Sequence, residues 1–244
     1  MREFNVTGIC VPEMHYMVDI SEKIEEIFML VEGRKYFTIN RGRQFGKTTT
    51  LGMLEKRLPD DYVCASISFQ FSDEEMYASA EGFCQELLNR IYNALIINNE
   101  EEAQLWIDDS ITSFKALSHF ITKRCRGKKV VLIIDESDEA SNNQLFVMFL
   151  KMLRDKYLLR NAGKDFTFQS VILAGVYDVR NLKQKMILAG KYTPSEGEST
   201  MNSPWNIAID FKVDMSFSAK EIETMLVDYE NDHHTGMDTG TIAS

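Results

Sequence analysis

The sequence predicts an α/β protein with a mostly parallel central sheet. Short runs rich in β-branched and aromatic residues alternate with longer stretches in which apolar residues recur at helical spacing. One of these runs, residues 130–134, is apolar throughout, as expected for a central strand that is buried on both faces. The hydrophobic share of 44% and the charged share of 26% are close to those of average globular proteins. Together these observations exclude a disordered chain, a fibrous repeat and a disulfide scaffold.

The predicted elements follow one another along the chain as strand, helix, strand and helix. Residues 36–40 form the first predicted strand, and further strands are predicted at residues 62–69, 130–134, 170–175 and, with the alternation of a strand nearer an edge, 207–215. Apolar positions at helical spacing predict helices around residues 51–58, 83–95 and 145–153. Ser218 is expected to cap the last helix, with Glu221 completing a capping box.

The domain organisation follows from this order. We expect residues 1–35 to be an N-terminal segment that packs on the core, and residues 36–230 to be the core domain. Residues 183–204 carry Gly, Pro, Ser and Glu, which predicts an exposed excursion from the core. Residues 231–244 show no packing pattern and are expected to be a disordered tail.

Charge and cysteine content restrict the partners and the compartment. The net charge of −10 argues against nucleic acid as the main ligand, because such binding draws on Lys and Arg. The basic run at residues 123–129 is expected to be the solvated end of a helix. The four Cys form no C-x-x-C pair, which is typical of reduced thiols in the cytoplasm. We expect no signal peptide, because Arg2, Glu3 and Asn5 interrupt any apolar start, and no apolar stretch approaches the about 20 residues that span a bilayer. We therefore expect a cytoplasmic protein with no membrane contact.

Residues 41–50, with the sequence RGRQFGKTTT, lie between a predicted strand and a predicted helix and resemble a Walker A phosphate-binding loop. In such a loop, backbone N–H groups and the helix N-terminus face the phosphates. Lys47 is expected to reach the β- and γ-phosphates, and the Thr48 hydroxyl to bind Mg²⁺. Arg41 stands where the first glycine is expected, so either the loop turns differently or it is a degenerate copy. The residues predicted to bind the nucleotide are Gly42, Arg43, Gln44, Phe45, Gly46, Lys47, Thr48 and Thr49.

The second motif is the apolar run at residues 130–134 followed by Asp135 and Glu136, which has the Walker B form. Asp135 at the strand tip is expected to hold Mg²⁺, and Glu136 is expected to polarise the attacking water. The alternative interpretation of this sequence is a buried strand that ends in a solvated acidic turn. Because the two motifs occur in the right order, the catalytic interpretation is favoured, with Glu136 and Lys47 as the catalytic residues.

At this point the sequence resembles the AAA-ATPase-like family of bacterial P-loop ATPases, which is allied to the AAA+ and STAND classes. The matching stretches span nearly the whole chain and are residues 8–12 (GICVP), 15–19 (HYMVD), 40–48 (NRGRQFGKT), 133–138 (IIDESD), 171–178 (VILAGVYD) and 203–208 (SPWNIA). P-loops of this family similarly carry Arg at the position of the first glycine, so Arg41 fits the family pattern.

The resemblance implies a three-layer P-loop NTPase sandwich that binds ATP and Mg²⁺. Longer relatives carry a PD-(D/E)XK nuclease-like domain after the ATPase module. We expect that domain to be absent here and the C-terminal helical lid to be truncated. Arg154 and Arg160 are either arginine fingers for another subunit or solvated side chains. His15, Tyr16 and Asp19 either border the adenine pocket or fix the N-terminal segment by hydrogen bonds.

Four functions remain in competition. The first is an ATPase that couples hydrolysis to a conformational change, with a homo-oligomer or a protein partner left open. The second is a nucleotide-dependent switch or scaffold that binds ATP with little hydrolysis. A small-molecule kinase is disfavoured because no Arg-rich lid follows residue 136. The last is a non-catalytic α/β module in which both motif matches are accidental.

Overall fold

The structure is a computed structural model, and it describes residues 2–5, 8–40, 46–70, 74–137, 140, 143–175, 209–210 and 216–244. The chain divides into two compact units. The first comprises Met1–Met29, Arg43–Arg57 and Lys212–Ser244, and the second comprises Leu30–Gly42 and Leu58–Phe211. The predicted excursion at residues 183–204 lies outside the described residues.

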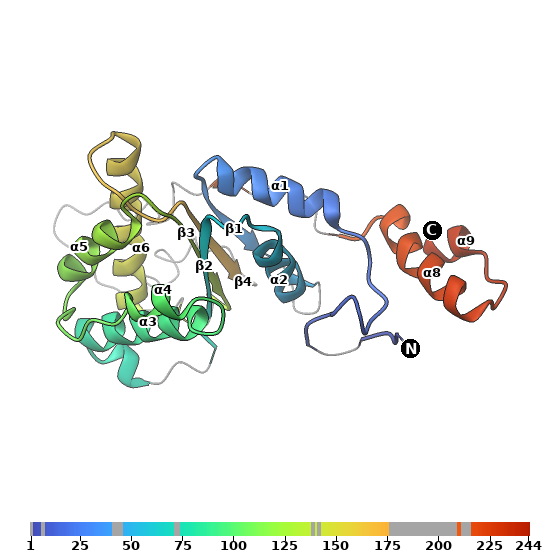
Figure 1. Ribbon diagram of the computed structural model, residues 1–244, viewed down its shortest axis with the longest axis horizontal. Helices are drawn as coiled ribbons and strands as arrows, with labels where there is room; N and C mark the ends of the chain where they lie inside the picture. The colour runs from blue at the N-terminus through green and yellow to red at the C-terminus, as the bar shows by residue number, and fades with distance from the viewer. Residues whose placement is uncertain are drawn as a thin grey trace, which may run out of the picture. The chain divides into compact units, whose positions relative to one another are not determined.

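The second unit is built on a sheet of parallel strands, as the sequence predicts (Figure 1). Within the described part of the chain the strand order is β2-β3-β4-β1-β5. The strands are β1 (Tyr36–Asn40), β2 (Tyr62–Ser68), β3 (Lys129–Asp135), β4 (Ser170–Gly175) and β5 (Ile209–Asp210). Every pair of neighbours is parallel. Among the strands that the structure describes, β5 lies at one edge, and of the strand expected at residues 207–215 only 209–210 are described.

The apolar run at residues 130–134 becomes the interior strand β3. All of β3 except Lys129 is buried, and the strand pairs with β2 on one side and β4 on the other. In this register Ser68 at the end of β2 lies opposite Asp135 at the end of β3. Gly175 at the end of β4 lies opposite Asn40 at the end of β1. Because all strands are parallel, their carboxyl ends share one edge of the sheet. The ends of β1 and β3 are separated there by β4.

Helices pack on one face of this sheet. They are α3 (Ala80–Leu95), α4 (Glu100–Gln104), α5 (Phe114–Cys125) and α6 (Gln144–Asn161), and a short 3-10 helix, η1 (Glu74–Tyr77), precedes them. Phe83 of α3 lies at the centre of this core, with its ring centroid 5.6 Å from those of Phe114 and Phe149. Alternate side chains of β2, β3 and β4 belong to the same core. Ser79, Asn99, Ser113 and Asn143 cap the four helices.

The first unit contains α2 (Lys47–Arg57), α8 (Ala219–His233) and α9 (Thr239–Ala243), and α1 (Ser21–Glu32) begins in it. The capping box predicted at the start of α8 is confirmed: the Glu221 amide donates to the Ser218 hydroxyl, and the Ser218 amide donates to the Glu221 carboxylate. Arg2 holds the N-terminal segment to α8 through Asp228 at 2.7 Å and Asp232 at 3.0 Å.

Two segments for which the sequence predicted no helix contain helices in the structure. Residues 231–244, expected as a disordered tail, contain the end of α8 and the short helix α9. Residues 1–35, expected as a packing segment without assigned elements, contain α1. None of the helices that the structure describes is both long enough and apolar enough to cross a membrane.

Candidate functional site

The predicted phosphate-binding loop runs between β1, which ends at Asn40, and α2, which begins at Lys47. Arg41 and four predicted ligands, Gly42, Arg43, Gln44 and Phe45, lie outside the described residues. Gly46 has φ +73°, a left-handed conformation in which an L side chain is strained. The first turn of α2 closes when the Thr50 amide donates to the Gly46 carbonyl at 2.8 Å. The strand and the helix predicted on either side of the loop are therefore both present.

Lys47 is the first residue of α2, and its position is electrostatically unusual. The side chain is only 6% exposed, and Nζ is buried without a hydrogen-bond partner among the residues the structure describes. The N-terminus of a helix carries a partial positive charge, which disfavours a cation there. Burying an unpaired ammonium is also unfavourable. A bound anion would relieve both effects, because phosphate oxygens accept hydrogen bonds from the ammonium and from the free N–H groups of the helix.

The two threonines after Lys47 have different surroundings. Thr48 is exposed. Thr49 Oγ1 accepts a hydrogen bond from the Cys10 amide at 3.1 Å, which bonds the N-terminal segment to the first turn of α2. The Thr49 hydroxyl keeps its own proton to donate. The Phe217 ring also lies beside this turn, 3.7 Å from the position that a Cβ on Gly46 would take.

Asp135 and Glu136 follow the carboxyl end of β3. Asp135 is 9% exposed, and its carbonyl oxygen accepts a hydrogen bond from the Phe69 amide at 3.1 Å. Its Oδ1 accepts a hydrogen bond from the Glu136 amide at 2.8 Å, which fixes the carboxylate over the turn. Glu136 has φ +51°, a region that non-glycine residues rarely adopt and that is often found at functional sites.

Ser137 anchors the turn that carries Glu136. Its side chain is 2% exposed, and both its hydroxyl and its amide donate to the Ala174 carbonyl at 3.0 Å. The turn after β3 is thereby tied to the end of β4. Sequence reasoning missed this role, and the only signal was a small hydroxyl residue directly after the acidic pair.

The strands that precede the two motifs belong to one parallel sheet. In parallel α/β sheets, ligands bind at the carboxyl ends of the strands. The residues predicted to bind nucleotide follow β1, and Asp135 and Glu136 follow β3, so both motifs continue from this edge of one sheet. A threonine hydroxyl and a carboxylate are oxygen donors of the kind that Mg²⁺ prefers. In the described part of the chain, no three or more His, Cys, Asp or Glu side chains are grouped to hold a metal by themselves.

Arg160, one of the two arginine-finger candidates, has a structural role. Its guanidinium donates to the carbonyl oxygens of Arg34 at 2.6 Å and of Phe168 at 2.5 Å, and lies over the ring of Tyr36. Tyr36 begins β1, so Arg160 ties together the amino edge of the sheet, opposite the predicted site. This arrangement matches neither of the two roles expected for Arg160, an arginine finger for another subunit or a solvated side chain. Arg154 remains 32% exposed, with Asp155 at 3.8 Å.

For His15, Tyr16 and Asp19, the observed contacts support the second of the two expected roles. His15 Nδ1 accepts a hydrogen bond from the Val11 amide at 2.9 Å. The Tyr16 hydroxyl donates to Asp232 on α8 at 2.9 Å. Hydrogen bonds from the side chain and the amide of Ser21 lower the pKa of the Asp19 carboxyl. All three residues therefore fix the N-terminal segment.

Comparison with known proteins finds similarity in structure and none in sequence families. No protein-family model matches the sequence, and no curated protein does. A Walker-type ATPase of Pyrococcus abyssi is similar over 98% of this chain, with a TM-score of 0.57 and 12% identity, and the chain spans 65% of that protein. The ORC1 protein of Aeropyrum pernix in complex with DNA is similar over 88% of this chain, with a TM-score of 0.45 and 10% identity, and the chain spans 50% of it. The likeness to the Pyrococcus protein shows that the chain has a P-loop NTPase fold.

Proposed function

We propose that this chain binds ATP with Mg²⁺ and hydrolyses it, and that hydrolysis drives a conformational change. The observation that carries the proposal is Lys47, an ammonium that is 6% exposed, lacks a described hydrogen-bond partner and begins a helix. A protein keeps such a group where a ligand completes it, because structural optimisation alone would replace or pair it. Phosphate is the ligand whose charge and geometry fit a lysine at a helix N-terminus.

Each remaining residue takes a role that its position permits. Gly46 lets the backbone approach the phosphates, and the loop residues 42–45 together with Thr49 would surround them. Thr48 and Asp135 would hold Mg²⁺, which supplies charge neutralisation at the β- and γ-phosphates. Glu136, beside Asp135 in the turn after β3, would orient and polarise the attacking water.

Within the P-loop ATPases, we propose that the chain belongs to the AAA-ATPase-like family of bacterial proteins. The support for this assignment is the pattern of residues 40–48 and 133–138, together with the fold shared with a Walker-type ATPase. A homo-oligomer or a protein partner would then receive the conformational change. Nucleic acid is not indicated for this chain, because its net charge is −10.

Nucleotide binding is tested by calorimetric titration of Mg·ATP into the wild type and into Lys47→Ala. We expect binding to the wild type and a loss of at least about tenfold in affinity for the variant, since a charge-assisted contact to phosphate is removed. Lys56→Ala is the matched control, because Lys56 lies exposed at the other end of the same helix. Equal affinities for the wild type and Lys47→Ala would contradict the proposal.

Hydrolysis is tested separately with Glu136→Gln, by measuring phosphate release and ATP affinity in parallel. We expect turnover to fall by roughly 10²–10⁴-fold while affinity is retained, because the substitution removes the base and leaves the shape. Glu32→Gln, at an exposed position, serves as the control. If the wild type binds ATP but hydrolyses it no faster than Glu136→Gln does, the protein is a nucleotide-dependent switch and not an ATPase.

A further inference from the structure

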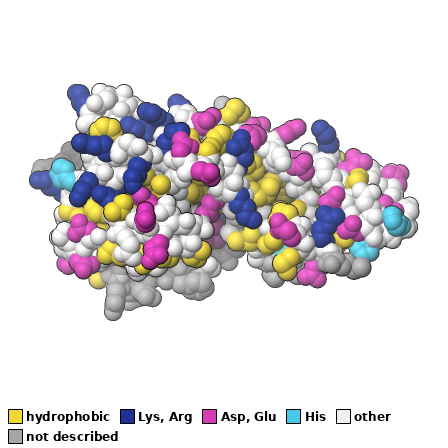
Figure 2. Space-filling model, in the orientation of Figure 1, with side chains coloured by type: hydrophobic (Ala, Val, Ile, Leu, Met, Phe, Trp, Pro, Cys, Tyr) yellow, Lys and Arg dark blue, Asp and Glu magenta, His cyan; other side chains and the backbone are white. Residues whose placement is uncertain are grey.

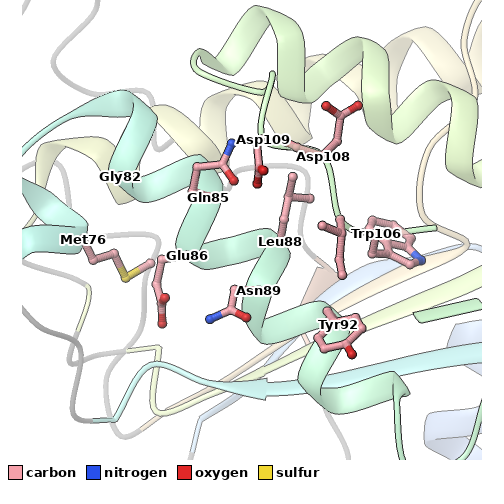
Figure 3. Close-up of a pocket in the computed structure, with 11 residues that line it drawn as sticks. Met76, Gly82, Gln85, Glu86, Leu88, Asn89, Tyr92, Trp106, Asp108 and Asp109 are labelled. Carbon is pink, nitrogen blue, oxygen red and sulfur yellow. Dashed lines mark hydrogen bonds between the residues drawn. The ribbon is translucent and has the colours of Figure 1, made fainter. Parts of the chain in front are cut away.

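An open groove runs along α3 in the second unit, outside both motifs. It has a volume of about 520 Å³ and lies between α3 and the segment that follows α4 (Figure 3). The Gln85 side-chain amide donates to the carbonyl oxygens of Asp108 at 3.2 Å and Ile111 at 3.1 Å. These bonds hold the segment against α3, so the groove is preformed.

Part of the groove lining is apolar, and the rest is polar. Leu88 and Trp106 are buried beneath it, with exposed fractions of 2% and 0%. Tyr92, which is half-buried, and Ile107, which is 50% exposed, also line the groove. An apolar side chain that covers Tyr92 and Ile107 would remove their exposed surface from water, which is favourable in proportion to the area buried.

The rim of the groove is acidic. Among the described lining residues, Glu86, Asp108 and Asp109 are carboxylates, and none is Lys, Arg or His. Arg90 neutralises Glu86 at 2.7 Å, and Figure 3 shows the Asp108 carboxylate directed away from the other lining side chains. Asp109 has no ion pair or hydrogen bond with any described residue, and its carboxylate lies beside Gln85. Asp109 is therefore the anion most available to a ligand.

The surrounding surface has the same character. In Figure 2, Asp and Glu side chains mix with hydrophobic ones over α3 and α4, whereas Lys and Arg gather over α5. The first turn of α4 adds Glu100 and Glu101, both exposed, and Leu105 is 44% exposed beside it. A partner for this surface must complement negative charge and apolar area together.

We propose that this groove docks a short segment of a protein partner that carries Lys or Arg next to an aliphatic or aromatic side chain. The apolar side chain covers the exposed surface of Tyr92 and Ile107, and the cation pairs with Asp109. The proposal does not depend on nucleotide binding.

The test selects ligands from a phage-displayed library of random heptapeptides on the immobilised full chain. Peptides that are enriched are synthesised, and their affinities are measured by fluorescence anisotropy. We expect enriched peptides to combine Lys or Arg with an adjacent Leu, Ile, Phe or Trp. Their affinity should fall about tenfold in Asp109→Asn, and by a similar factor in Ile107→Ser, because each variant removes one of the two anchors.

Two matched variants control for charge and hydrophobicity elsewhere on the same unit. Asp60→Asn removes an exposed carboxylate, and Ile97→Ser removes a side chain that is 86% exposed, both outside the groove lining. Neither should change peptide affinity. The proposal is overturned if no peptide is enriched, or if enriched peptides bind Asp109→Asn and Ile107→Ser as tightly as the wild type. It is also overturned if sedimentation shows a self-association that Asp109→Asn abolishes, since a second copy of the chain would then fill the groove.

Discussion

The Ser137 hydroxyl donates a hydrogen bond to the Ala174 carbonyl oxygen across 3.0 Å, and the Ser137 amide donates to the same oxygen. On the other side of the turn, Asp135 is held by the strand ladder opposite Ser68. Glu136 therefore bridges two fixed residues, and it does so with φ +51°. The backbone at this predicted catalytic position is set by its neighbours and not by its own preference.

The first prediction concerns this strained position. Glu136→Gly should be more stable than Glu136→Ala by about 1 kcal/mol, because only glycine adopts the left-handed region without a steric penalty. Unfolding in urea measures the difference. Asp155, exposed within α6, provides the opposite case: there the glycine variant should be less stable than the alanine variant by about 1 kcal/mol. The same order of stability at both positions would contradict the assignment.

The second prediction concerns the ligand-free protein. Lys47→Met should raise the free energy of unfolding by about 1 kcal/mol, since methionine fills similar space without burying an ammonium. The same variant should lose Mg·ATP binding, as expected where function is maintained at the expense of stability. Lys56→Met should change stability by no more than about 0.5 kcal/mol. A less stable Lys47→Met would show that the ammonium is stabilised in the folded chain.

The third prediction concerns a buried ion pair. Lys156 is 2% exposed, and its Nζ donates to Asp165 at 2.8 Å. Burial acts to raise the pKa of the Asp165 carboxyl, but hydrogen bonds from Lys156, Thr122 and the Phe166 amide outweigh it, and the pKa is lowered. Because the folded pKa lies below the unfolded one, this stabilisation is fully present above about pH 4 and is lost as the pH falls through the folded pKa.

Asp165→Ala should therefore lower the free energy of unfolding by about 3 kcal/mol at pH 7, because it leaves the Lys156 charge unpaired. The gap between this variant and the wild type should shrink as the pH falls below about 4. Urea unfolding at a series of pH values measures it. Replacing both partners, in Lys156→Met with Asp165→Leu, should cost less than Asp165→Ala alone. If the difference in free energy of unfolding between the wild type and Asp165→Ala is the same at every pH, Asp165 is not the group whose titration changes the stability.

Most of the sheet was predictable because its strands are marked by local composition. β3 is apolar from residue 130 to residue 134, and β1 and β4 were placed at their observed bounds. The start of α8 was predictable because a capping box is a local signal. The strand expected at residues 207–215 can be compared with the structure only at 209–210, where β5 lies, since the other residues are outside the described part of the chain.

The nucleotide and magnesium ligands remain predictions from residue type, and the sequence says less about the geometry around them. The sequence places Lys47 after a strand, but its burial depends on side chains that only folding brings together. The bonds from Cys10 to Thr49 and from Ser137 to Ala174 join residues 39 and 37 positions apart. Arg160 was misjudged for the same reason, because the carbonyl oxygens it binds belong to distant segments.

The central claim is that Lys47 completes a site for Mg·ATP, and thermal unfolding with and without Mg·ATP tests it most directly. A ligand at about 100 times its Kd adds about 2.7 kcal/mol of stability, which for a chain of this size corresponds to a rise in Tm of roughly 5–10 °C. We expect this rise for the wild type and for Lys56→Ala, and none for Lys47→Ala. If the wild type shows no rise at millimolar Mg·ATP, or if Lys47→Ala rises equally, the claim is contradicted.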